Sequence, residues 1–213
     1  MKAEKLLEEI FAAERAIRAA EERLLRENEQ QLSRMLQAAV DEAKRLKDPR
    51  EAELRLHCLA DLCAQVPGAA MSDALIEILD EENPAIRAEA ADALLDVGYH
   101  RYAEVARAIE RALDAGRSGP VMEELPFFLA EIAEPSALPL LSRFLEHPKK
   151  EIVAAAIEAI SELGDPEGVE LLEGFVDDPR EVFIDRDEDD SMKGTLGELA
   201  QEAIEALGGD LED

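Results

Sequence analysis

Residues 151–164 read EIVAAAIEAISELG, and this stretch decides the fold because the chain contains a second copy of it. The other copy, AIRAEAADALLDVG at 85–98, aligns without a gap at a shift of 66 residues, and its apolar and acidic positions largely coincide. The segment before each copy aligns in the same register, with Leu75 falling on Leu141. Self-similarity at a fixed period is the signature of a repeat architecture. The sequence therefore predicts stacked helical units.

Two further alignments define the unit. Residues 133–141 match 164–172 at a shift of 31, and 201–208 match 157–164 at a shift of 44. The 13 extra residues of the last copy fall in a loop near 182–194. The unit is a helix pair of about 31–35 residues, in which Gly follows the second helix and Asp-Pro or Glu-Pro opens the next unit.

The motifs LGDPEGVELLEGFVDDP (163–179) and IVAAAIEAISELGDP (152–166) resemble HEAT repeats, in particular the short, phycobilisome-lyase-type repeats. The resemblance covers residues 70–213 clearly and 50–69 more loosely. It implies an all-α fold, a right-handed α-solenoid of HEAT-like helix pairs whose second helices line the concave face where partners bind. An aromatic content of only 4% agrees with a helical rather than a β-rich chain.

The N-terminal part differs from the repeats, because residues 3–46 contain neither Pro nor Gly. Apolar residues recur there in steps of four and three, which is typical of a coiled-coil seam or a long packed helix. The polar stretch 27–31 interrupts the pattern, so the arm is one long helix or two helices broken near 28–31. The arm seam is expected at Leu6, Ile10, Ala13, Ile17, Ala20 and Leu24, and a second stripe at Leu32, Met35, Leu36, Ala39, Ala43 and Leu46.

Asp48-Pro49 ends this segment, so we expect a long N-terminal helical arm over 1–48 and an acidic repeat solenoid over 49–213. Two interpretations of the arm stay open. Its seam packs on the first repeat as a cap, which terminal repeats need. Alternatively, it pairs with a partner helix or with a second copy of the chain, as a homodimer.

Charge is divided unequally along the chain. Residues 1–50 hold 11 Lys and Arg against 11 Asp and Glu, so residues 51–213 carry the whole net charge of −28. Such a body repels nucleic acid and anionic membranes and attracts proteins with a basic surface or peptide. There is no secretory-type apolar segment and no apolar run of 18 residues, and Cys58 and Cys63 are placed for reduced thiols rather than for a disulfide. A cytoplasmic location is the expectation.

The candidates for chemistry are weak. His57, Cys58 and Cys63 point in different directions on one helix, so a zinc site is not expected from them. The acidic run 185–190 resembles a calcium loop, but Asp190 stands where Gly is required and Leu196 where a bidentate Glu is required. Neither a P-loop, a GxGxxG motif nor a GxSxG elbow occurs. We expect no enzyme activity, no cofactor and no metal.

The second helices of the repeats carry the partner-binding hypothesis. Positions opposite their expected cores are mostly acidic, and stacking would align them into a ridge interrupted by Phe127, whose neighbour Phe128 competes for the core. Because the chain is so acidic, most of its exposed faces would carry similar charge. The acidic ridge alone therefore does not distinguish a binding surface from an ordinary exposed face. The candidate residues are Glu89, Asp92, Asp96, Glu124, Phe127, Glu131, Glu158, Glu162 and Glu202.

These features predict a non-catalytic scaffold or adaptor that binds another protein through the ridge and the arm. The alternative is a toxin-neutralising (immunity-type) or nucleic-acid-mimicking acidic protein that blocks a basic partner. Salt dependence separates the two, since screening weakens a purely electrostatic contact most.

Overall fold

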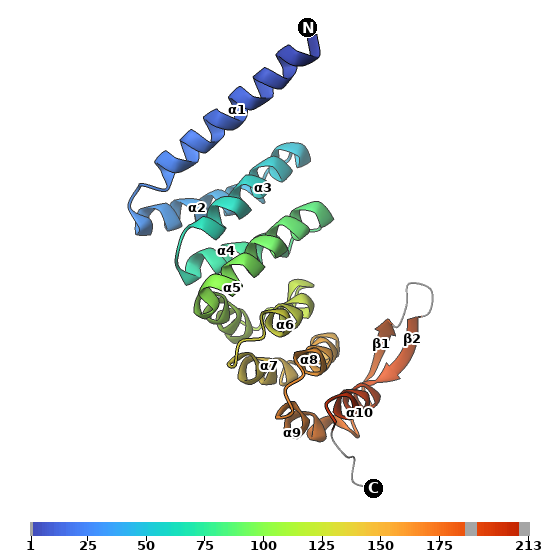
Figure 1. Ribbon diagram of the computed structural model, residues 1–213. Helices are drawn as coiled ribbons and strands as arrows, with labels where there is room; N and C mark the ends of the chain where they lie inside the picture. Colours follow the sequence, from blue (N-terminus) through green and yellow to red (C-terminus); the bar gives the residue numbers. More distant parts are fainter. Residues whose placement is uncertain (1, 186–190, 209–213) are drawn as a thin grey trace. The chain divides into compact units, whose positions relative to one another are not determined.

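The computed structural model describes residues 2–185 and 191–208 (Figure 1). These residues form a succession of helices with one pair of strands near the C-terminal end. The elements are α1 (Lys2–Leu24), α2 (Glu29–Ala43), α3 (Pro49–Gln65), α4 (Ala69–Leu79), α5 (Pro84–Asp114), α6 (Val121–Ile132), α7 (Ala137–Leu145), α8 (Lys150–Leu163), α9 (Gly168–Leu172), the short 3-10 helix η1 (Glu173–Phe175), β1 (Glu181–Asp185), β2 (Ser191–Thr195) and α10 (Leu196–Ala206). The predicted all-α solenoid of helix pairs is confirmed.

The chain divides into two compact units, Met1–Val97 and Gly98–Asp213, and the boundary falls within α5. Residue Arg101 interrupts α5 with non-helical angles (φ −145°, ψ 46°), so the element is two helices joined at a kink. The sequence predicted that Gly98 would end a helix, and this was wrong. Gly98 lies inside α5, where a Cβ would approach Cδ1 of Ile132 to 2.3 Å.

In the first unit, the N-terminal arm consists of two helices rather than one. α1 ends at Leu24, and α2 starts after Asn28, whose side chain accepts a hydrogen bond from the amide of Gln31 at 3.2 Å. Asn is a favoured N-cap because its oxygen satisfies an amide that has no partner within the helix. The break therefore spans residues 25–28, at the start of the polar stretch.

The two halves of the arm differ in burial. In α2, Leu32, Leu36 and Ala43 are buried, and the helix packs against α3 and α4. In α1 the seam is exposed, with 52% of Leu6, 61% of Ile10 and 52% of Ile17 accessible.

The second unit is organised around α8, which packs against α6, α7 and α10. Most of α8 is buried, including Ile152, Ile157 and Ile160, and its alanines allow close approach from several sides. Gly164 ends the helix with φ of 70°, a left-handed conformation that glycine adopts without a steric penalty. The predicted glycine cap is thus confirmed at this position.

The insertion predicted as a loop near 182–194 contains secondary structure. β1 and β2 pair antiparallel, with Glu181 opposite Thr195, and β1 packs on α8 (Figure 1). Lys150, at the start of α8, donates a hydrogen bond to the carbonyl of Glu181. Of the acidic run 185–190 that was considered as a calcium loop, Asp185 ends β1, and residues 186–190 lie outside the described residues.

None of the helices in the described ranges is both long and apolar enough to cross a membrane. Neither cysteine takes part in a disulfide: Cys58 is exposed, whereas Cys63 is buried. Burial raises the pKa of the Cys63 thiol to about 12.

Candidate partner-binding face

The second helices of the second unit, α6, α8 and α10, lie side by side, since α8 contacts both of the others. Each turns its large apolar side chains into the core, as Leu125 and Leu129 do in α6. The side away from this core keeps the acidic residues that follow one another at helical spacing, such as Glu158 and Glu162 in α8. One face of this unit is therefore acidic because the carboxylates lie on the side of these helices that points away from the core.

Between α6, α8 and the strand pair lies a hollow of about 310 Å³, called here the Phe127 hollow. Phe127 is half-buried in its wall, whereas the neighbouring Phe128 is only 8% exposed and fills the core. This decides the open choice between the two phenylalanines. The residues that line the hollow are Glu123, Phe127, Glu151, Ala154, Ala155, Glu158, Val182 and Phe183.

A second hollow of about 390 Å³, called here the Glu202 hollow, lies between α8 and α10. Its residues are Glu158, Ser161, Glu162, Leu199, Glu202, Ala203 and Ala206. Glu158 lines both hollows, so they adjoin along α8. Together they form a two-part surface rather than two isolated depressions.

Alanines and carboxylates dominate this surface, and Lys193 lies beside Phe183 at the edge of the Phe127 hollow. Ala154, Ala155 and Ala203 are small, buried and uncharged, while carboxylates stand among them. None of the described residues that line either hollow is Lys or Arg. A Lys or Arg side chain fits such a site, because its methylene stem can cover apolar surface while its charged end meets a carboxylate.

Within the second unit the structure brings several of the predicted residues together. Phe127 and Glu158 share one hollow, and Glu158, Glu162 and Glu202 share the next. Glu124 is half-buried on α6 outside both hollows, and Glu131 accepts a hydrogen bond from the hydroxyl of Tyr99 at 3.2 Å. The pKa of Tyr99 is raised, first by loss of hydration and then by this carboxylate.

The other predicted residues belong to the first unit. Glu89 forms an ion pair with His57, while Asp92 and Asp96 are exposed on α5. Of the arm seam, Leu6, Ile10 and Ile17 are exposed and Leu24 is half-buried. The predicted ridge is therefore seen as one surface only where it runs over α6, α8 and α10.

Sequence reasoning missed the contribution of the strand pair. Phe183 is 72% exposed at the edge of the Phe127 hollow, and the ammonium of Lys193 lies 5.8 Å from the centre of its ring. The signal was the run Val182-Phe183-Ile184, which is typical of a strand and unusual in an otherwise helical, aromatic-poor chain. Because the insertion was treated as a loop, its aromatic side chain was not considered.

Comparison with known protein families gives one match, to HEAT repeats, over residues 124–186. This segment is less than half of the chain; it begins within α6 and includes α7, α8, α9, η1 and β1. The helical fold and this match support a HEAT-like repeat protein, which is the coarser part of what the sequence motifs predicted. The phycobilisome-lyase-type likeness stays a prediction.

Designed repeat proteins are among the solved structures to which the chain is similar. One is a designed armadillo repeat protein in complex with the peptide (KR)4, at 19% identity and a TM-score of 0.37, covering 91% of this chain and 92% of that chain. Another is a computationally designed armadillo repeat protein for modular peptide recognition, at 13% identity and a TM-score of 0.35, covering 83% and 92%. A search of curated proteins finds no match.

Proposed function

We propose that this protein is a non-catalytic binding scaffold that takes a basic, partly apolar peptide segment of another protein on the face formed by α6, α8 and α10. The observation that carries this proposal is the pair of adjoining hollows that share Glu158 and combine alanine floors with glutamate walls. Repeat folds present extended surfaces of this kind for protein partners.

The proposed division of roles follows from the side chains. Phe127 and Phe183 offer aromatic surface to an apolar side chain of the ligand, and aromatic anchors contribute strongly to binding when they become desolvated. Glu158, Glu162 and Glu202 offer carboxylates to Lys or Arg at neighbouring positions. The net charge of −28 speeds the approach of such a segment at low salt.

The test uses fluorescein-labelled peptides and fluorescence anisotropy on the full-length protein. We expect a peptide of alternating Arg and Leu to bind more tightly than one of Arg and Ser, and a Glu and Leu peptide not to bind. Phe127→Ala and Glu158→Gln should each weaken binding by about tenfold, equivalent to about 1.4 kcal/mol. Glu146→Gln is the matched control, because Glu146 is exposed at the end of α7 and lines neither hollow.

Salt separates the proposal from its alternative, a toxin-neutralising or nucleic-acid-mimicking protein that blocks a basic surface. Part of the Arg and Leu affinity should persist at about 0.5 M NaCl, where charges are screened within a few ångströms. Equal binding of the Arg and Leu and the Arg and Ser peptides, lost at high salt and unaffected by Phe127→Ala, would support the alternative instead.

We also propose that α1 pairs with α1 of a second copy. The exposed seam at Leu6, Ile10 and Ile17 has no cover within the described residues, and heptad-spaced apolar residues of this kind pack against a second helix. The arm is neutral, unlike the rest of the chain, so two arms can approach without the repulsion that two acidic bodies would meet.

Light scattering on the full chain tests the pairing. We expect a concentration-dependent dimer that the double substitution Ile10→Asp and Ile17→Asp abolishes. Ala12→Asp serves as control, because it adds charge to α1 away from the seam. A monomer at all concentrations would refute self-pairing and leave a helix of another protein as the remaining partner for the seam.

A further inference from the structure

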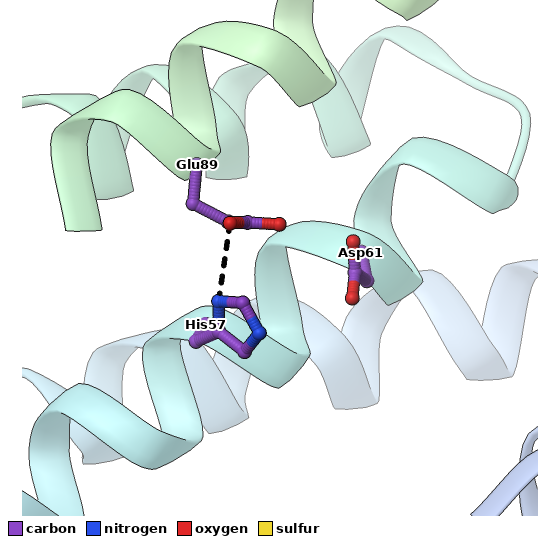
Figure 2. Close-up of side chains that lie close together, drawn as sticks. All are labelled: His57, Asp61 and Glu89. Atoms are coloured by element: carbon purple, nitrogen blue, oxygen red, sulfur yellow. Dashed lines mark ion pairs between the residues drawn. The ribbon is translucent and has the colours of Figure 1, made fainter. Parts of the chain in front are cut away.

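A histidine and two carboxylates converge in the first unit, on a part of the surface that the proposed function does not use. His57 and Asp61 are one turn apart on α3 and share a face, and Glu89 reaches toward them from the first half of α5 (Figure 2). Nδ1 of His57 lies 3.3 Å from Oε2 of Glu89. One ligand-type atom from each of the three residues lies within 4.8 Å of the other two.

We propose that His57, Asp61 and Glu89 bind a divalent transition-metal ion of the zinc class. Imidazole nitrogen with carboxylate oxygen is a donor set that suits Zn²⁺, whereas Mg²⁺ and Ca²⁺ prefer oxygen alone. In a tetrahedral site with bonds of about 2.0–2.1 Å, neighbouring donor atoms are about 3.3 Å apart.

The observed spacing meets that requirement with little movement. The pair His57 and Glu89 is already at such a separation, and the 4.8 Å limit leaves about 1.5 Å for Asp61 to close. His57 and Asp61 are exposed and Glu89 is half-buried, so their side chains can rotate without disturbing the core. The ion would join two helices that one ion pair now links.

The two cysteines of the first unit are not expected to take part in metal binding at this cluster. Cys58 is exposed, but it does not belong to the group of residues whose ligand atoms converge on this spot among the described residues. Cys63 is buried. The sequence predicted no metal site, and the combination of His57 with the two cysteines that it rejected shares only His57 with the set proposed here.

Elsewhere, His147 is committed to the fold. Its Nδ1 accepts a hydrogen bond from the amide of Lys149 at 3.1 Å, so Nε2 carries the proton and donates to the carbonyl of Arg117 at 3.0 Å. Both ring nitrogens are thus in use, and the ring is buried.

A hollow of about 310 Å³ beside the cluster gives the site a place for a further ligand. His57 forms part of its wall together with Leu54, Ala85 and Ile86, and Leu54 is 60% exposed. Three protein ligands leave a coordination position of a zinc-class ion open. A carboxylate or imidazole of a partner could take that position while apolar atoms next to it enter the hollow.

The test titrates ZnCl₂ into the full-length protein by isothermal calorimetry and follows the imidazole nitrogens by long-range ¹H–¹⁵N NMR. We expect one saturable site above a background of weak carboxylate binding, with the resonances of His57 shifting and those of His147 unchanged. His57→Ala, Asp61→Asn and Glu89→Gln should each lower the affinity by about tenfold or more. CaCl₂ should not shift the His57 resonances.

His100→Ala and Glu82→Gln are the matched controls, since both residues are exposed and lie outside the cluster. They should bind Zn²⁺ as the unmodified protein does. If His57→Ala keeps the affinity, or if the control variants lose as much, the proposal is wrong. Circular dichroism of each variant shows whether it is still folded. If the spectrum is unchanged, a loss of Zn²⁺ affinity is assigned to the removal of the metal-ligating side chain.

Discussion

At the residue scale, the start of α10 depends on a few side chains and on Gly197, which has none. Gly197 donates a hydrogen bond from its amide to the carbonyl of Asp178 at 3.1 Å, and a Cβ on it would lie 2.7 Å from the carbonyl oxygen of Val176. The obstacle is backbone, which cannot rotate away as a side chain could. A residue without a side chain is therefore required where α10 meets the turn before β1.

Gly197→Ala should lower the free energy of unfolding by about 1–3 kcal/mol, although Ala is the better helix former. Urea denaturation followed by circular dichroism measures the change. Gly174→Ala is the control, since nothing lies within 4 Å of its added Cβ and it should be neutral or slightly stabilising. Equal stability of the two variants would contradict the close contact.

Asp178 and Arg180 form an ion pair at 2.7 Å beside this contact. Hydrogen bonds from the side chain and amide of Arg180 lower the pKa of Asp178 despite its partial burial. A carboxyl group with a lowered folded-state pKa stabilises the protein above its unfolded-state pKa, and this stabilisation is lost as the pH falls through the folded-state value.

Asp178→Asn should therefore cost about 1 kcal/mol at neutral pH, and the difference from the unmodified protein should shrink as the pH falls below about 4. Urea denaturation over a pH series measures this. Asp177→Asn, at an exposed neighbour, should show little cost. A difference that grows toward acid pH would show that the ion pair does not stabilise the fold.

At the element scale, α8 has the central place in the second unit and also supplies residues to both hollows. Its buried isoleucines pack among α6, α7 and α10, while the half-buried Glu158 lines both hollows. Packing and binding thus use opposite sides of one helix, so they should respond to different substitutions.

Ile157→Ala should lower the free energy of unfolding by about 2–5 kcal/mol, because Ile157 is fully buried and the substitution leaves a cavity. Glu162→Gln, on the exposed side of α8, should change it by less than about 0.5 kcal/mol. Thermal and urea denaturation measure both. A small effect of Ile157→Ala would mean that α8 is not the centre of this core.

In the strand pair, too, a substitution should affect peptide binding without affecting stability. Phe183→Ser should leave the melting temperature nearly unchanged, because the side chain is largely exposed, but should weaken the Arg and Leu peptide severalfold. Anisotropy and thermal denaturation of the same sample measure the two effects. Unchanged peptide binding would remove the strand pair from the proposed surface.

At the scale of the whole molecule, charge opposes folding. A net charge of −28 on 213 residues repels itself within the compact state, and salt screens that repulsion. Raising NaCl from about 0.02 M to about 0.5 M should therefore raise the melting temperature by several degrees. Calorimetry at a fixed protein concentration measures this shift, and a fall in the melting temperature would show that attractive ion pairs outweigh the repulsion.

At this scale, the features that could be predicted were those that follow from a periodic pattern of residues in the sequence. The shift of 66 residues between 85–98 and 151–164 predicted helix pairs, since an apolar period near 3.6 residues can be buried only by a helix. The same periodicity placed Ile152, Ile157 and Ile160 in the core and Glu158 and Glu162 on the outer side, and the structure has them there. Local chemistry also predicted the turn after α8, because Gly164 adopts the left-handed angle of a helix end without a steric penalty. The same expectation failed at Gly98, where the chain continues as a helix.

Contacts between segments far apart in the sequence were decided only by the tertiary structure. His57 and Glu89 are 32 positions apart, and Phe127 and Phe183 are 56 apart, so no local period relates them. The insertion gave no repeat to align, and its pairing depends on α8 and α10 beside it. The sequence by itself determined which faces of these helices are apolar and which acidic; only packing decided which acidic residues meet a histidine, which meet an aromatic ring, and which face solvent.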